Sequence, residues 1–238
     1  MTNTNIVCIL GMHRSGTSCL TGCLENYGLY LGDVINQSPF NAKGNKENKK
    51  MWMINDLVLS QSGGAWDQPP QQLTWNNEAR SLRDQFIESY DVYDVWGFKD
   101  PRCVLTLPFW LEALPNMKFA ATYRHPVSVA ESLRKRAKFP FEQSLSLWAA
   151  YNRIIIELAT RYTFPVICFD WNADEYLERV KKIADTLGIS NTTPVQQSQF
   201  FDSALISHQR PSLTEDSVAR EYLIIYKKLS ELSNTGIG

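Results

Sequence analysis

Short apolar runs alternate with longer amphipathic stretches along most of the chain. The apolar runs are bounded by polar segments and are too short for helices, which is typical of strands buried in a parallel sheet. They comprise residues 6–10, 94–99, 118–123 and 166–169, of which 94–99 is the least regular. Periodic apolar positions predict helices over residues 17–27, 46–60, 127–136, 142–162 and 174–187. This alternation predicts an α/β fold whose parallel sheet is covered by helices on both faces.

The C-terminal region contains one further helix signal. Ser212 and Glu215 have the spacing of a capping box, in which two side chains bond reciprocally to the backbone at a helix start. Apolar residues then recur every three or four positions from Val218 to Leu232, which indicates a helix with one apolar stripe. We expect this helix to pack on the rest of the protein, although the same stripe would also serve a homodimer.

Residues 61–77 form a long stretch without a regular pattern. The stretch contains Gly63-Gly64, Pro69-Pro70 and the tryptophans Trp66 and Trp75. Loops of this length in compact domains are often lids or substrate-binding segments. We therefore expect a partly ordered excursion that covers a binding site.

Composition places the chain among globular proteins. Of its 238 residues, 44% are hydrophobic and 21% are charged, which excludes a disordered or fibrous chain. No apolar run approaches the roughly 20 residues of a membrane span, and no basic and then apolar leader is present. Five cysteines without paired spacing indicate reduced thiols, so a cytoplasmic location is expected. The length predicts a single domain, 1–238, with its core at 6–187 and residues 191–238 packed on it.

Charge is balanced overall but concentrated locally. Lys and Arg total 24 against 25 Asp and Glu, so the chain is no general binder of nucleic acid. Between Lys118 and Lys138, however, six residues are basic and only one is acidic. Four lysines also surround Glu47 in the sequence; they are Lys43, Lys46, Lys49 and Lys50. These concentrations indicate a pocket for a small anion, although solvated helix faces would give the same pattern.

The segment after the first predicted strand carries the strongest chemical signal. It opens the first predicted helix and reads Gly11-Met12-His13-Arg14-Ser15-Gly16-Thr17-Ser18. Such a loop suits phosphate, because glycines let backbone N–H groups point inward and the helix N-terminus favours an anion. The spacing is that of Gly-x-x-x-x-Gly-Lys-Ser/Thr, but Thr17 stands at the lysine position. The cation is instead Arg14, whose planar fork suits a tetrahedral oxyanion, so we expect anion transfer without a triphosphate–magnesium complex.

These residues resemble the 5′-phosphosulfate-binding loop of the sulfotransferases that use 3′-phosphoadenosine 5′-phosphosulfate (PAPS). The Arg-Ser-Gly-Thr variant of carbohydrate, tyrosylprotein and many bacterial members is the most similar. Arg124 in Tyr123-Arg124-His125-Pro126 and Ser132, eight residues later, resemble the pair that grips the 3′-phosphate in this family. A strand-end arginine and a hydroxyl on the next helix can converge where open parallel sheets bind ligands. Weaker resemblance at 99–102 and 169–171 extends the match over residues 6–187.

The resemblance implies a P-loop NTPase-like topology, PAPS as the sulfonate donor and no metal requirement. It assigns cofactor binding to Gly11, His13, Arg14, Ser15, Gly16, Thr17, Ser18, Arg124 and Ser132. The segment 205–210 faintly matches the basic residues that close over the nucleotide in this family, which adds Arg210 and leaves His208 open. An ordinary polar loop is the alternative for this segment.

The resemblance also indicates a catalytic base. Residues 41–48 resemble the Asn-Pro-x-Gly-x-x-Glu signature of the same branch, whose catalytic glutamate corresponds to Glu47, with Ala42 and Lys46 as departures. His13 and His125 are the competing bases. A carboxylate among lysines would equally form a surface ion pair, which contributes under about 1 kcal/mol.

Sulfuryl transfer further requires that charge be stabilised on the leaving phosphate and on the transferring group. The loop N–H groups and Arg14 suit the leaving phosphate. Lys99 resembles the lysine that contacts the transferring group or the bridging oxygen in this branch. Asp100 and Arg102 are expected to form a structural pair that orients Lys99.

The sequence therefore predicts a sulfotransferase that moves sulfonate from PAPS to a hydroxyl of a sugar, a glycolipid or a small natural product. The tryptophans of residues 61–77 would stack on a sugar ring or cover an apolar acceptor. Two alternatives stay open. A P-loop small-molecule kinase is disfavoured by Thr17 and by the lack of a clear aspartate-ended second strand for magnesium. An inactive 3′-phosphoadenosine nucleotide-binding protein stays possible because the motif at Glu47 is imperfect.

Overall fold

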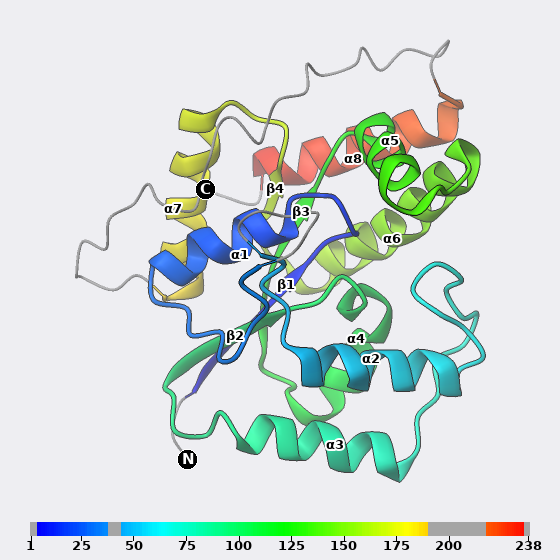
Figure 1. Cartoon of the computed structure of the whole chain (residues 1–238). Coiled ribbons are helices and arrows are strands. Elements are labelled where there is room, and N and C mark those ends of the chain that lie inside the picture. The colour runs from blue at the N-terminus through cyan, green and yellow to red at the C-terminus, as the bar shows by residue number, and fades with distance from the viewer. Residues whose placement is uncertain (1–3, 38–43, 190–217, 236–238) are drawn as a thin grey trace.

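The computed structural model describes residues 4–37, 44–189 and 218–235. Figure 1 shows its strands, which are β1 (Asn5–Leu10), β2 (Val95–Lys99), β3 (Lys118–Tyr123) and β4 (Val166–Cys168). Its helices are α1 (Thr17–Asn26), α2 (Lys49–Gln61), α3 (Asn77–Glu88), α4 (Cys103–Ala113), α5 (Pro126–Ala137), α6 (Phe141–Tyr162), α7 (Ala173–Leu187) and α8 (Arg220–Thr235).

The strands pair in parallel in the order β2-β1-β3-β4, with register pairs such as Val7↔Gly97 and Ile9↔Ala120. The chain leaves β1, forms β2 on one side of it, and then crosses to form β3 on the other side. The connections that follow the strands therefore diverge around the carboxyl end of β1. Open parallel sheets bind ligands at such a point, because the diverging loops leave a crevice there.

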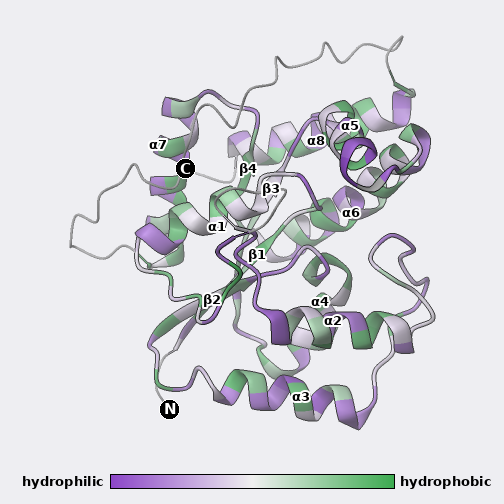
Figure 2. Cartoon of the chain, in the orientation of Figure 1, coloured by the Kyte–Doolittle hydropathy of each residue, from purple (hydrophilic) through white to green (hydrophobic). Residues whose placement is uncertain are grey.

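Alternate residues of β1 face two separate layers of helices. Val7 and Ile9 pack with buried residues of α1 and α7, whereas Cys8 and Leu10 pack with those of α4, α6 and α8. Figure 1 shows α1 and α7 together on one side of the sheet and α4 and α6 on the other. In Figure 2 the mixed colours of α3 and α7 show helices with both apolar and polar positions. The predicted parallel sheet covered on both faces is confirmed.

The predicted helix over residues 46–60 begins later than expected. Lys46 has a φ of 55°, which ends any helical path through it. Asn48 is the N-cap, and its side-chain oxygen accepts a hydrogen bond from the Lys50 N–H at 2.9 Å. The helix therefore runs over α2, Lys49–Gln61, and residues 44–48 form an irregular connection before it.

Helices α3 and α4 were not predicted from the sequence, because neither shows a clear amphipathic pattern. Helix α4 is buried around most of its circumference and contains Pro108, so it lacks the polar face that reveals a helical period. Helix α3 buries only Ala79, Arg83 and Phe86, too few apolar residues for a clear stripe. Asn76 caps α3 by accepting from the Ala79 N–H at 3.0 Å.

The connection between α2 and α3 is anchored at its end. The Trp75 Nε1–H donates to Glu112 Oε2 at 3.0 Å, and its ring packs against Phe109 with the centroids 5.7 Å apart. Arg80 and Arg83 donate to the same carboxylate. The expectation that both tryptophans of this segment cover an acceptor is therefore wrong for Trp75, because its ring and N–H are taken up by α4.

We expect Glu112→Gln to destabilise the protein at neutral pH but not in strong acid. The hydrogen bonds from Arg80 in particular, and those from Arg83 and Trp75, lower the pKa of Glu112 to about 2. A depressed carboxyl pKa contributes stability above its unfolded value, and this contribution is lost as the pH falls through the folded value. Because the side chain is 35% exposed, solvent screening keeps the effect under about 1 kcal/mol.

The measurement is urea unfolding of both proteins between pH 7 and pH 2. The stability gap should shrink from about pH 4.5 down to about pH 2. Glu88→Gln, at an exposed carboxylate that ends α3, serves as the control and should show no comparable gap. A gap of the same size at every pH would contradict the assignment.

The C-terminal helix begins later than the capping box at 212–215 predicts. Helix α8 starts at Arg220, and Val218 precedes it; the capping box itself lies outside the described residues. Tyr222, Ile225 and Leu229 are buried, and the helix packs on α6 and β4. The apolar stripe of the described part of the helix thus faces the same hydrophobic core as α4 and α6. Among the described helices, none combines the length and the apolar character needed to cross a membrane.

Candidate functional site

The loop between β1 and α1 folds tightly around two glycines. Gly11 has a φ of 154° and Gly16 a φ of 85°. A Cβ at Gly11 would lie 2.6 Å from Thr17 Cγ2, and a Cβ at Gly16 would lie 2.2 Å from the Phe169 ring. Arg14, with a φ of 68°, also adopts the left-handed conformation, which costs energy for a residue with a side chain. The sequence therefore folds here into the curled loop that anion binding requires.

The backbone N–H groups at the start of α1 and the Ser15 hydroxyl are available to donate hydrogen bonds to a ligand. Helix α1 begins at Thr17 and receives no side-chain cap at Gly16, so the N-terminal N–H groups keep their capacity for an anion. Ser15 Oγ is buried and has no hydrogen-bond partner among the described residues. Thr122 Oγ1 donates to the Ser15 carbonyl at 2.9 Å and ties the loop to β3.

Arginines from three segments gather beside the loop. The Arg14 Nε–H donates to Ser132 Oγ on α5 at 2.8 Å. Burial, together with the positive charges of Arg136 and Arg124, lowers the pKa of Arg14. Its guanidinium nonetheless stays protonated. A bound anion would relieve this mutual repulsion, so the cluster fits a phosphate or a sulfonate.

Arg136 is a member of this cluster that the sequence analysis missed. It lies four residues after Ser132 on α5. The i,i+4 spacing places both residues on one face of the helix. That spacing is the signal that would have identified Arg136.

Arg124 follows β3 directly and is held from two sides. Its Nε–H donates to Asp170 Oδ1 at 3.2 Å, and its guanidinium lies 5.2 Å from the centroid of the Phe169 ring. Asp170 Oδ2 also accepts from the His125 backbone N–H at 2.7 Å. The loose Phe-Asp-Trp match in the sequence therefore corresponds to residues that orient the strand-end arginine.

Glu47 and Lys99 meet at the carboxyl edge of the sheet. Lys99 ends β2, and its side chain is 1% exposed. Its Nζ donates to Glu47 Oε1 at 2.7 Å and to Ser18 Oγ at 3.3 Å. The structure thus brings together a proton acceptor, a buried ammonium and a hydroxyl of the loop, from three segments far apart in the sequence.

Backbone pairing fixes the segment that carries Glu47. The Ile35 N–H donates to the Glu47 carbonyl at 3.0 Å, and the Lys46 N–H donates to the Ile35 carbonyl at 3.1 Å. The Lys46 side chain bonds Glu25 at 2.8 Å and Asn36 at 2.7 Å. Lys46 is therefore engaged by neighbours other than Glu47, and the carboxylate of Glu47 pairs with a lysine from β2 instead.

The expected pair of Asp100 and Arg102 is present and belongs to a larger network. Asp100 is fully buried; its Oδ1 accepts from the Arg102 N–H at 3.0 Å and from Nη1 at 3.1 Å. Its Oδ2 accepts from Asn55 Nδ2 on α2 at 3.1 Å. Arg102 also donates through Nε to Asp56 at 2.5 Å. This network joins α2 to the residue next to Lys99.

The two histidines take different positions. His13 packs against Trp66, with centroids 4.4 Å apart, and its Nε2 is buried without a hydrogen-bond partner in the described part of the chain. Burial, followed by the charges of Arg102 and Lys99, lowers the pKa of His13, so the ring is neutral. His125 is the N-cap residue of α5 and is 2% exposed, with its ring 5.4 Å from that of Tyr226.

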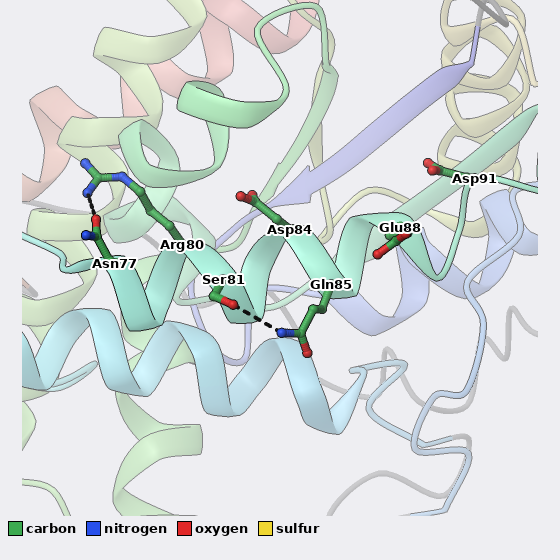
Figure 3. A pocket seen from close by; sticks show the side chains of 7 residues that line it. All are labelled: Asn77, Arg80, Ser81, Asp84, Gln85, Glu88 and Asp91. Atoms are coloured by element: carbon green, nitrogen blue, oxygen red, sulfur yellow. Dashed lines mark hydrogen bonds between the residues drawn. The ribbon is translucent and has the colours of Figure 1, made fainter.

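His208 and Arg210 fall outside the described residues. A solvent-open pocket of about 640 Å³ runs along α3, and Figure 3 shows its lining side chains, Asn77, Arg80, Ser81, Asp84, Gln85, Glu88 and Asp91. None of the candidate site residues in the described ranges lines this pocket.

Comparison with known proteins shows the fold. No protein-family model matches the chain, and no curated protein has a significantly similar sequence. Among solved structures, the sulfotransferase domain from the Synechococcus PCC 7002 olefin synthase is similar, with a TM-score of 0.52 and 15% sequence identity. The match covers 99% of this chain and 95% of that chain. At this identity the likeness shows the fold alone, and it confirms the predicted P-loop NTPase-like α/β class.

Proposed function

We propose that this protein is a PAPS-dependent sulfotransferase that transfers sulfonate to a hydroxyl of a sugar, a glycolipid or a small natural product. The observation that carries the proposal is the pairing of Glu47 with Lys99 at 2.7 Å beside Ser18 of the phosphate-type loop. The similarity of the fold to a sulfotransferase domain supports it. In this function the loop would bind the sulfonate donor, and the Glu47–Lys99 pair would contact the acceptor hydroxyl and the transferring group.

The residues around the loop fit the two anionic ends of such a donor. The resemblance assigns residues 11–18 to the 5′-phosphosulfate and Arg124 with Ser132 to the 3′-phosphate. The uncapped start of α1, the buried Ser15 hydroxyl and the clustered arginines favour an anion at this place. Arg210 stays a proposed ligand of the same nucleotide.

When bound, PAPS supplies a sulfonate group on a phosphate leaving group. Arg14 and the loop N–H groups would stabilise the negative charge that develops on the departing phosphate. Glu47 would accept the proton of the acceptor hydroxyl as the new oxygen–sulfur bond forms. The ammonium of Lys99, held by Glu47, would stabilise charge on the transferring group. No described residue needs to hold a metal in this scheme.

A P-loop kinase is a weaker candidate. The structure offers one carboxylate at the place where a kinase would hold magnesium, but that carboxylate is already engaged. The sequence analysis finds no clear aspartate at the end of a second strand, yet Asp100 follows β2 directly. Both oxygens of Asp100 are already bonded, to Arg102 and to Asn55, so the carboxylate is poorly placed to hold magnesium. Thr17 also lacks the charge of the lysine that a triphosphate needs.

We expect 3′,5′-ADP to raise the melting temperature far more than AMP does. A ligand selective for the folded state stabilises by about 2.7 kcal/mol at a hundredfold excess over its Kd. AMP lacks the 3′-phosphate that Arg124 and Ser132 would bind, so most of the gain should be absent. Differential scanning fluorimetry measures both shifts. Equal shifts from the two nucleotides would contradict the assignment of Arg124 and Ser132.

The activity itself is tested with ³⁵S-labelled PAPS and a panel of hydroxyl acceptors, with and without EDTA. Transfer of the label that EDTA does not reduce is the expected result. Phosphoryl transfer from ATP that EDTA abolishes would favour the kinase. Binding of 3′,5′-ADP without transfer to any acceptor would favour the inactive nucleotide-binding protein.

A further inference from the structure

Helix α2 presents an aromatic ring and a carboxylate one turn apart. Trp52 is 37% exposed, and the Asp56 side chain is 45% exposed. The Arg102 guanidinium joins them, because its Cζ lies 5.5 Å from the centroid of the Trp52 ring while its Nε–H donates to Asp56 Oδ1 at 2.5 Å. An exposed tryptophan beside a carboxylate and a guanidinium is a surface with both an apolar face and polar edges.

This triad of Trp52, Asp56 and Arg102 rests on a buried network. Asn55, between the two α2 residues, is fully buried; its Oδ1 accepts from Thr106 Oγ1 and from Trp110 Nε1, each at 2.8 Å. Its Nδ2 donates to Asp100, which in turn holds Arg102. Because these polar groups satisfy one another inside the protein, Arg102, which contacts both other members of the triad, is anchored in a buried network.

The triad and the Glu47–Lys99 pair lie along the same two segments. Glu47 precedes the α2 N-cap, and Asp56 follows within α2; Lys99 precedes Asp100, and Arg102 follows it. Ion pairs therefore join the segments twice, at Glu47–Lys99 and at Asp56–Arg102. The helical rise places Asp56 about 12 Å from Asn48 along the axis. An acceptor whose hydroxyl reaches Glu47 can extend along α2 toward Trp52 and Asp56.

The chemistry of the triad restricts what such an acceptor can be. Asp56 Oδ2 has no partner among the residues that the structure describes, so this exposed oxygen is free to accept a hydrogen bond from a ligand. A simple phenol would use its single hydroxyl at Glu47 and offer none to Asp56. A saccharide has a C–H face for the indole ring and further hydroxyls for the carboxylate and the guanidinium.

We propose that Trp52, Asp56 and Arg102 form the acceptor subsite and that the acceptor is an uncharged saccharide of at least two rings. One ring would present its hydroxyl to Glu47, and the next would pack on Trp52 with a hydroxyl donating to Asp56. The term acceptor subsite rests on the proposed sulfotransferase function. The binding test below, however, does not depend on turnover.

Saturation-transfer NMR tests the subsite in the presence of excess 3′,5′-ADP. The probes are methyl β-lactoside, methyl β-cellobioside and diacetylchitobiose, with 4-nitrophenol and tyramine as a phenol and a cationic amine. We expect at least one disaccharide to bind, and its signal to fall at least fivefold in Trp52→Ala and in Asp56→Asn. Trp52→Phe should retain part of the signal. Met53→Ala, at a more exposed neighbour on the same helix, is the matched control and should bind as the parent protein does.

The outcomes separate the subsite from the donor site. A thermal shift by 3′,5′-ADP that is unchanged in the variants shows that they fold and keep the donor site. If no disaccharide binds the parent protein, or if Trp52→Ala and Asp56→Asn bind it as well as Met53→Ala does, the proposal is overturned. Tyramine binding that depends on Asp56, or 4-nitrophenol binding that depends on Trp52, would also overturn it. Disaccharide binding without any 3′,5′-ADP binding would support the subsite and contradict the sulfotransferase.

Discussion

Glu47→Gln is expected to lower turnover by at least about a hundredfold while 3′,5′-ADP binds as it does to the parent protein. The glutamine carbonyl can still accept from Lys99 Nζ, which lies 2.7 Å from Glu47 Oε1, so the local packing survives. An amide cannot take the proton of the acceptor hydroxyl, however, and a positioned base contributes about that factor. Steady-state sulfonate transfer and the thermal shift by 3′,5′-ADP measure the two effects separately.

A second carboxylate–lysine pair provides the control for this experiment. Glu178 bonds Lys182 at 3.5 Å on α7, so Glu178→Gln removes the same charge from an ion pair outside the proposed site. Its turnover should stay near that of the parent protein. If Glu47→Gln kept most of its activity, the base would have to be sought at His13 or His125, and the Glu47–Lys99 pair would be structural.

Arg14→Ala is expected to weaken donor binding and to slow transfer together. The charge of Arg14 would serve the bound donor and the departing phosphate alike, so both KM and kcat should change. Removing one donor to a developing negative charge costs about a hundred- to a thousandfold in kcat. Initial rates at varied PAPS concentration separate the two constants.

Two further variants sharpen the test of Arg14. Arg134→Ala removes a charge from an exposed residue of α5 and should leave both constants unchanged. Ser132→Ala removes the acceptor of the Arg14 Nε–H bond but keeps the guanidinium, so its loss in kcat should be smaller. If Arg14→Ala changed KM and kcat only as much as Ser132→Ala does, the role of Arg14 would be structural, as a hydrogen-bonded link between the loop and α5.

The strands and the phosphate-type loop were predictable from the sequence because their signals are local. Residues 6–10 form an apolar run, and the glycines and the helix start that follow lie within eight positions of one another. Glu47 and Lys99 could be assigned through resemblance, since each lies in a short motif. By contrast, the sequence did not indicate that α2 starts at Lys49. Lys46 has a positive φ and pairs through its N–H with the Ile35 carbonyl, far back in the chain, and Asn48 is the N-cap.

By itself, then, the sequence determined the α/β class and the loop at residues 11–18, both of which depend on neighbours along the chain. The choice of Glu47 as the candidate base came from the family resemblance. Only the tertiary structure decided that Lys99 pairs with Glu47, that Arg14 bonds Ser132, and that Arg102 links Asp56 to Asp100. It also decided the helicity of α4, whose apolar circumference hides its period until neighbouring elements bury it. The Glu47–Lys99 and Asp56–Arg102 pairs join residues 52 and 46 positions apart, and no local pattern specifies which distant partner a charged side chain will meet.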